Sequence, residues 1–139
     1  MTTHRVAAEE ALARCDWAQA ENEFRRALAQ SPTDPWSLDG LCLALSWLGD
    51  GRGCREARER AYVEHRRLGN ARHAAAAALF VASDYRVSEG NQAAWAGWVR
   101  RAERCLDGLG PCPEHGTIEV ERAKCAADPE TREAHAQRR

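Results

Sequence analysis

A helix-forming segment, a short turn and a second helix-forming segment recur along this chain, and this recurrence restricts the fold more than any other feature. In the first unit, a turn at residues 15–17 precedes small residues at Ala20 and Ala27, with Phe24 on the same helical face. Pro32 follows, where it cannot continue a helix. The pattern begins again after about 34 residues, a repeat length typical of stacked helix pairs.

The recurrence divides the chain into units that each hold a helix pair, the last of them partial. These units span about residues 1–34, 35–70, 71–110 and 111–139. Helices are expected over about residues 3–14, 34–48, 71–88, 92–106 and 114–126, and after the turns at 15–17 and 49–51. Gly69 is expected to end a helix in the left-handed conformation, and residues 107–113 form a loop. Asp128 and Pro129 are expected to begin a closing helix over residues 130–139.

Each expected helix carries a stripe of small or apolar residues, so the chain is predicted to be a single all-α domain of packed helix pairs. An ordinary helical bundle would also have amphipathic helices, and the recurrence favours the repeat. The stripe residues are Ala7, Ala8, Ala11, Leu12, Leu38, Leu41, Cys42, Leu45, Cys54, Ala57, Ala61, Ala75, Ala78, Leu79, Ala82, Tyr85, Trp95, Trp98, Val99, Ala102, Cys105, Ile118, Val120 and Cys125.

Charge and hydropathy narrow the classes of function. Lys+Arg number 20 against 21 Asp+Glu, which argues against direct binding of nucleic acid by this chain alone. No apolar stretch is long enough to cross a membrane, and the N-terminus lacks the apolar region of a signal peptide. A cytoplasmic location is therefore expected, with the six cysteines as reduced and mostly buried thiols.

Three stretches resemble the tetratricopeptide segments of LuxR-type transcriptional regulators. They are EEALARCDW at 9–17, WLGD at 47–50 with ERAY at 59–62, and PCPEHG at 111–116. Cys15 stands where glycine is usual, and Ala61 stands where a large apolar residue is usual. The resemblance implies antiparallel helix pairs stacked as a tetratricopeptide-like right-handed superhelix.

The same resemblance implies a regulatory module that senses or docks a partner. In such regulators a separate C-terminal helix-turn-helix domain reads DNA, and none is present before Arg139. We therefore expect either an excised fragment or a stand-alone relative, and DNA binding is not transferred to this chain.

Stacked helix pairs form a concave groove lined mainly by the first helix of each pair. Aromatic residues beside carboxylates there predict a protein or peptide partner carrying basic groups, and the alternative is a small ligand. The principal groove residues are Trp36, Asp39, Leu43, Trp47, Phe80 and Asp84, and helical phase adds Arg5, Glu9 and Glu121. A competing interpretation places Trp47 and Phe80 in the core between units. Trp17 is expected to pack at a turn, and Trp95 and Trp98 to fill the junction between the third and fourth units.

A weak zinc pattern is present near the C-terminal loop, although no cofactor is predicted. Cys112 and His115 have the two-residue gap of a ligand pair, and Cys105 and Cys125 would complete a tetrahedral set. The remaining histidines (His4, His65, His73 and His135) show no ligand spacing and are expected at the surface.

No catalytic pattern is found. The chain has neither a phosphate-binding glycine loop nor a nucleophile elbow, so no enzyme activity is expected. Alternating charges over residues 55–60 predict an exposed helix with weak ion pairs between neighbours. Self-association is a further expectation, because the last unit of an open stack leaves apolar surface uncovered.

Overall fold

The computed structural model describes residues 3–127, which form seven α-helices and no strands. The all-α prediction is therefore confirmed for these residues. The expected closing helix over 130–139, with Asp128 as its N-cap, and His135 lie outside them. The helices are α1 (Thr3–Ala13), α2 (Trp17–Gln30), α3 (Pro35–Trp47), α4 (Gly51–Arg67), α5 (Ala71–Glu89), α6 (Gln92–Leu106) and α7 (Pro113–Ala127).

Most helices begin at an Asp or Asn whose side chain accepts a hydrogen bond from a first-turn amide. Asp16 caps α2, Asp34 caps α3, Asp50 caps α4 and Asn91 caps α6, with bonds of 3.3, 3.2, 2.9 and 3.0 Å. Such a cap stabilises a helix by about 1 kcal/mol. The recurring turn in the sequence is thus a recurring cap in the structure.

The turns that precede α2 and α4 share one backbone geometry. Cys15 has φ 61° and Gly49 has φ 85°, both in the left-handed region. The next residue, Asp16 or Asp50, donates its N–H to the carbonyl of the residue five positions earlier. Cys15 therefore occupies the conformation that glycine usually takes at a helix end, which explains why glycine is the usual residue there.

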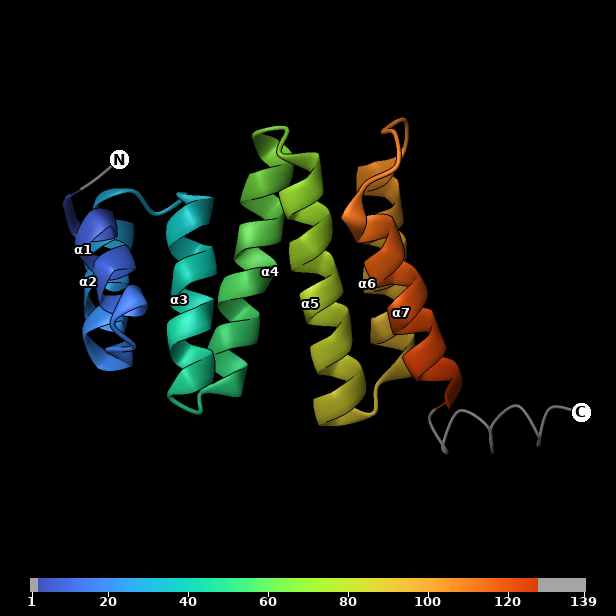
Figure 1. Cartoon of the computed structure of the whole chain (residues 1–139), viewed down its shortest axis with the longest axis horizontal. Coiled ribbons are helices and arrows are strands. Elements are labelled where there is room, and N and C mark those ends of the chain that lie inside the picture. The colour runs from blue at the N-terminus through green and yellow to red at the C-terminus, as the bar shows by residue number, and fades with distance from the viewer. Residues whose placement is uncertain (1–2, 128–139) are drawn as a thin grey trace, which may run out of the picture.

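The helices follow one another in a row, with α1 and α2 at one end and α6 and α7 at the other (Figure 1). Each helix packs on its neighbour in sequence, and α1 also contacts α3 while α5 contacts α7. Gly40 permits the close approach of α2 and α3, because a Cβ there would lie 2.1 Å from the Phe24 ring. One buried cluster joins α1 through α4, and a second, rich in alanine, joins α4 through α7.

Most of the predicted stripe residues are buried, and one outcome differs. Val120 is 53 % exposed, because α7 buries Ile118, Glu121 and Cys125 instead. Trp98 packs edge-on against Tyr62 of α4, beside the buried cluster that joins α4 through α7.

Candidate functional site

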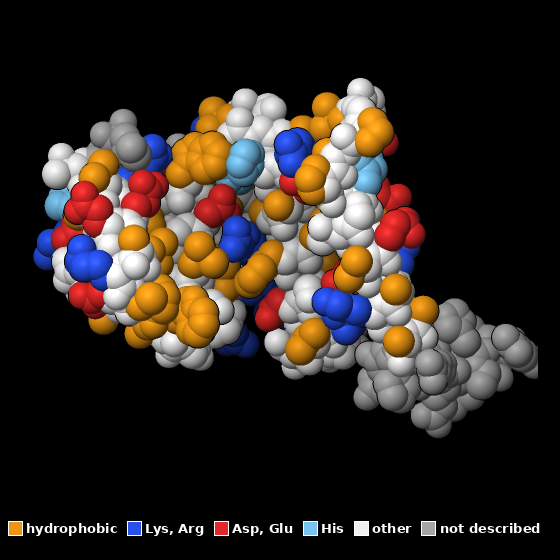
Figure 2. Space-filling model, viewed as in Figure 1, with side chains coloured by type: hydrophobic (Ala, Val, Ile, Leu, Met, Phe, Trp, Pro, Cys, Tyr) orange, Lys and Arg blue, Asp and Glu red, His pale blue; other side chains and the backbone are white. Residues whose placement is uncertain are grey.

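The exposed apolar residues predicted for the groove form one stripe along α3. Trp36, Leu43 and Trp47 are 40, 45 and 68 % exposed. Their spacing of seven and then four residues places them on the same side of the helix. The alternative that Trp47 is a core residue is therefore wrong. Figure 2 shows orange side chains interleaved with red and blue ones on the face formed by α3, α4 and α5.

Phe80 of α5 is half-buried against the buried cluster that joins α1 through α4. Its ring therefore contributes to the core and also lies beside the face formed by α3, α4 and α5. Trp47 stacks on Trp17 with ring centroids 5.1 Å apart and planes 8° from parallel. The expectation that Trp17 packs at a turn is confirmed, and its partner is a groove residue.

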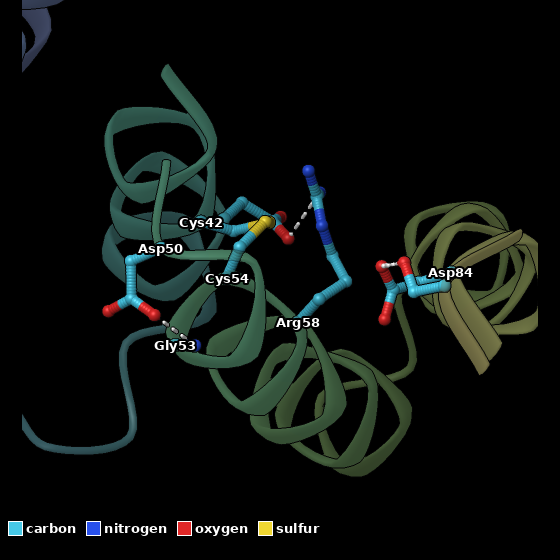
Figure 3. The surroundings of a disulfide bond; sticks show 8 residues. Cys42, Asp50, Gly53, Cys54, Arg58 and Asp84 are labelled. Carbon is cyan, nitrogen blue, oxygen red and sulfur yellow. Dashed lines mark hydrogen bonds and ion pairs between the residues drawn. A yellow bond between two sulfur atoms is a disulfide. The ribbon is translucent and has the colours of Figure 1, made fainter. Parts of the chain in front are cut away.

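The floor between α3 and α5 is made by two arginines of α4. Arg58 donates to Asp39 at 2.9 Å, and its guanidinium lies over the Phe80 ring at 4.7 Å. Arg55 donates to Asp84 at 3.1 Å. Figure 3 shows Arg58 between the Cys42–Cys54 disulfide and Asp84. The carboxylates predicted to attract a basic partner are thus already paired within the chain.

This arrangement corrects the prediction that residues 55–60 form an exposed helix with local ion pairs. The side chains of Arg55 and Arg58 are only 14 and 15 % exposed, and both bond to other helices. Sequence neighbours could supply local pairs, whereas the real partners lie 29 and 19 residues away.

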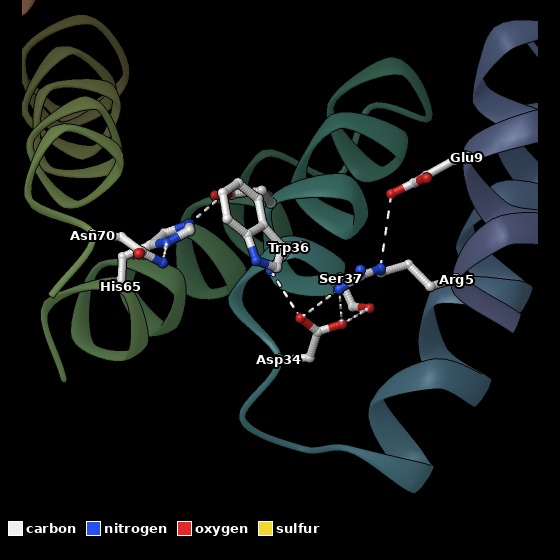
Figure 4. Close-up of polar contacts among 8 residues, drawn as sticks. Arg5, Glu9, Asp34, Trp36, Ser37, His65 and Asn70 are labelled. Carbon is white, nitrogen blue, oxygen red and sulfur yellow. Dashed lines mark hydrogen bonds and ion pairs between the residues drawn. The ribbon is translucent and has the colours of Figure 1, made fainter. Parts of the chain in front are cut away.

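His65 is completely buried, which corrects the expectation that it is a surface residue. Its Nε2 lies 2.7 Å from Asp39, and its Nδ1 lies 3.1 Å from the side-chain nitrogen of Asn70. Because an amide nitrogen is only a donor, Nδ1 accepts and Nε2–H donates to Asp39. Trp36 covers the imidazole edge-on at 4.9 Å, and Figure 4 shows this group.

Two further histidines expected at the surface, His4 and His73, differ in their exposure and both contact other side chains. His4 is half-buried, with Nδ1 2.7 Å from Glu23. His73 is exposed, and its ring lies 4.6 Å from Trp36 and 5.3 Å from His65. Three rings from α3, α4 and α5 therefore meet at one end of the face.

Two further groove predictions, Arg5 and Glu9, belong to the joint between α1 and α3. Arg5 Nη1 donates to both carboxylate oxygens of Asp34 at 3.0 Å, and its Nε lies 3.9 Å from Glu9. Asp34 also accepts from Ser37 Oγ at 2.6 Å (Figure 4). This cluster fixes how the first helix packs on the third.

Two hollows lie between α5 and α7, with volumes of about 470 and 380 Å³. They meet at Ala76 and Glu114, which line both. Of the predicted residues, Phe80 and Glu121 line the smaller hollow. Glu121 is buried and accepts from Arg86 at 2.9 Å and from the Trp95 indole at 3.0 Å, so Trp95 does meet the last unit as expected.

Glu114, which lines both hollows, forms an ion pair with α5. It accepts two hydrogen bonds from Arg72 of α5, at 3.0 and 3.3 Å. This pairing is the main reason that the pKa of Glu114 is lowered.

The cysteines do not all remain thiols. Cys42 and Cys54 form a disulfide between α3 and α4, so the expectation of six reduced cysteines is wrong for these two. Of the cysteines outside the disulfide, Cys15 is exposed and Cys125 is buried. The signal for the disulfide was in the sequence, because both partners were assigned to the inner stripes of neighbouring helices.

The zinc candidates are only partly brought together. Cys112 Sγ lies 3.2 Å from His115 Nδ1. Burial raises the pKa of the Cys105 thiol, although Arg66 and a hydrogen bond with Tyr62 act in the opposite direction. Within residues 3–127, no group of three His, Cys, Asp or Glu side chains is placed to hold a metal ion.

No family model matches the chain, and no curated protein matches it. Across residues 3–127, no helix is long and apolar enough to cross a membrane.

Proposed function

We propose that this chain is a protein- or peptide-binding scaffold whose helix pairs stack as a tetratricopeptide-like right-handed superhelix. The repeated Asp-capped turns before α2 and α4 support the repeat, as do the contacts of α1 with α3 and of α5 with α7. A sensing role within a regulatory system is part of the same proposal, and it rests on the resemblance to LuxR-type regulators.

The observation that carries this proposal is the exposed stripe of Trp36, Leu43 and Trp47 on α3. Large apolar side chains aligned on one helix face give a partner a continuous surface to bury. Tryptophan is also enriched among the residues that dominate binding energy.

The pairing of the carboxylates changes the chemistry expected of the partner. Asp39 and Asp84 each form an ion pair with an arginine of α4. Their charges are therefore already balanced within the chain and do not require a cationic group of the partner. We therefore propose that apolar or aromatic side chains of the partner provide the main contacts, with polar groups around them.

An affinity pull-down with matched variants tests this function. The test variant is Trp36→Ala/Leu43→Ala, which removes exposed surface and leaves the paired charges intact. The control is Val63→Ala/Leu68→Ala, which removes apolar groups that are 56 and 52 % exposed on and after α4. Asp39→Ala is unsuitable, because it would leave the buried His65 without its partner.

We expect the parent and the control to retain the same protein and the test variant to lose it. Circular dichroism should show equal helicity for all three. Equal retention by the test variant and the control would show that this stripe does not bind the partner.

A small-ligand site is the second candidate, and the hollows between α5 and α7 favour it. Ala76 lines both and is exposed, so Ala76→Leu should fill them without disturbing the core. A ligand that binds there should raise the melting temperature of the parent and not that of the variant. A ligand with equal effects on both proteins binds elsewhere.

A further inference from the structure

Four arginines, one on α4 and three on α6, make no ion pair within residues 3–127. They are Arg66 at the end of α4 and Arg100, Arg101 and Arg104 on α6. Arg66 donates to the Tyr62 hydroxyl at 3.3 Å, and Arg101 lies over the Trp98 ring at 4.4 Å. In contrast, the arginines that face the groove, such as Arg55 and Arg58, meet carboxylates. The positive charges of these four arginines are therefore not balanced by a paired carboxylate within residues 3–127.

Two of these arginines border the same hollow. Arg66 from α4 and Arg104 from α6 line a space of about 190 Å³ together with Gly69, Ala71 and Cys105. Both arginines are exposed, so a ligand can reach them from solvent. Two arginine side chains that line one hollow offer several N–H donors to a single anion.

The start of α5 borders this hollow without adding a free backbone donor. Asn70 is the N-cap of α5 and makes no side-chain cap bond, and its side-chain nitrogen bonds to His65. Ala71, the first residue of α5, lines the hollow, and its N–H donates to the carbonyl of Gly69 at 3.0 Å. The donors available to a ligand in this hollow are therefore those of Arg66 and Arg104.

Nearby acidic groups are directed elsewhere. Glu64 pairs with Arg67 at 2.8 Å, and Glu103 pairs with Arg122 of α7. Cys105 is the remaining titratable group in the lining, and burial raises the pKa of its thiol, which keeps it uncharged at neutral pH. No negative charge in the lining opposes a bound anion.

We propose that the hollow between Arg66, Arg104 and Ala71 binds a phosphate group, either free phosphate or a phosphate monoester. A tetrahedral oxyanion with two negative charges matches two guanidinium groups better than a carboxylate with one negative charge does. This site is separate from the aromatic stripe of α3, so it gives the scaffold a second point of recognition.

Isothermal titration of the whole chain with inorganic phosphate tests the site. The test variant is Arg66→Gln/Arg104→Gln, and the control is Arg52→Gln, an exposed arginine at the start of α4. We expect the test variant to bind phosphate about tenfold or more weakly, because two charge-assisted contacts are lost. The control should stay within about twofold of the parent.

Two further titrations identify the source of the phosphate. Capped peptides with serine or phosphoserine at one position are compared with inorganic phosphate. Tighter binding of the phosphopeptide indicates a phosphorylated protein partner, and equal or weaker binding indicates a small phosphate compound. The proposal is overturned if the parent and the test variant bind phosphate equally, or if acetate binds as tightly as phosphate.

Discussion

The basic side chains on the two sides of α4 differ in their burial and in whether they form ion pairs. Towards α3 and α5, Arg55, Arg58 and His65 each bond to a carboxylate and are largely buried. Towards α6, Arg66 donates to a tyrosine hydroxyl, has no ion pair within residues 3–127 and, like Arg104, is exposed. Paired charges in a buried seam fix the positions of helices, whereas unpaired charges at the surface remain available to a ligand. The same helix thus contributes to a structural floor and to a proposed binding site.

The largest effect is expected from His65→Ala, on the paired side. The change removes a completely buried ring and leaves Asn70 and Asp39 without one of their partners. We expect the free energy of unfolding to fall by about 3–4 kcal/mol, as measured by urea denaturation. His73→Ala, at an exposed ring, should cost less than about 1 kcal/mol. Equal losses of unfolding free energy in the two variants would mean that the hydrogen bonds of His65 do not stabilise the packing of α4 on α3.

Reduction of the Cys42–Cys54 disulfide should have the next largest effect. The bond closes a short loop between α3 and α4, so its loss should lower the free energy of unfolding by about 3 kcal/mol in the loop-entropy account. Urea denaturation with and without dithiothreitol measures this difference. The Cys42→Ala/Cys54→Ala variant should not respond to dithiothreitol. Six alkylated cysteines in the untreated protein would contradict the assignment.

A direct comparison of the two sides comes from single arginine changes. Arg58→Gln removes a largely buried partner of Asp39 and should cost about 1–3 kcal/mol of unfolding free energy. Arg104→Gln should change it by less than about 0.5 kcal/mol, because an exposed, unpaired side chain is lost. Thermal denaturation of both variants measures the contrast. If the order were reversed, the assignment of a structural and a binding side would be wrong.

The smallest effect is a pH dependence at the pair Arg72–Glu114. Arg72 lowers the pKa of Glu114 below its ordinary value of 4.5, so the stabilisation is present above that pH. It is lost as the pH falls through the lowered pKa and Glu114 becomes protonated. Arg72→Gln should therefore lower the melting temperature slightly at pH 7 and leave it unchanged at low pH. A difference that persists at low pH would assign the effect to packing.

The features that depend on neighbouring residues could be predicted from the sequence. The spacing of Leu38, Leu41, Cys42 and Leu45 gave the buried stripe of α3, because helical periodicity is local. Asp16 and Asp50 mark helix starts for the same reason, since a cap bonds within its own first turn.

The features that depend on distant residues could not be predicted in the same way. The burial of His65 follows from Asp39 and Asn70, which come from α3 and from the turn after α4. The partners of Arg55 and Arg58 depend on how α4 sits between two other helices. The groove residues on α3 followed from helical phase, whereas the charges beneath them required the packing.

Photo-crosslinking from α3 tests the central claim most directly. Benzoylphenylalanine is placed at position 43 of the exposed stripe or, as the control, at position 63 of α4, and each protein is irradiated in lysate. The account predicts that position 43 captures a specific protein, that position 63 does not, and that Trp36→Ala reduces the capture. Capture from position 63 alone, or equal capture from both positions, would contradict the assignment of the α3 stripe as the binding surface.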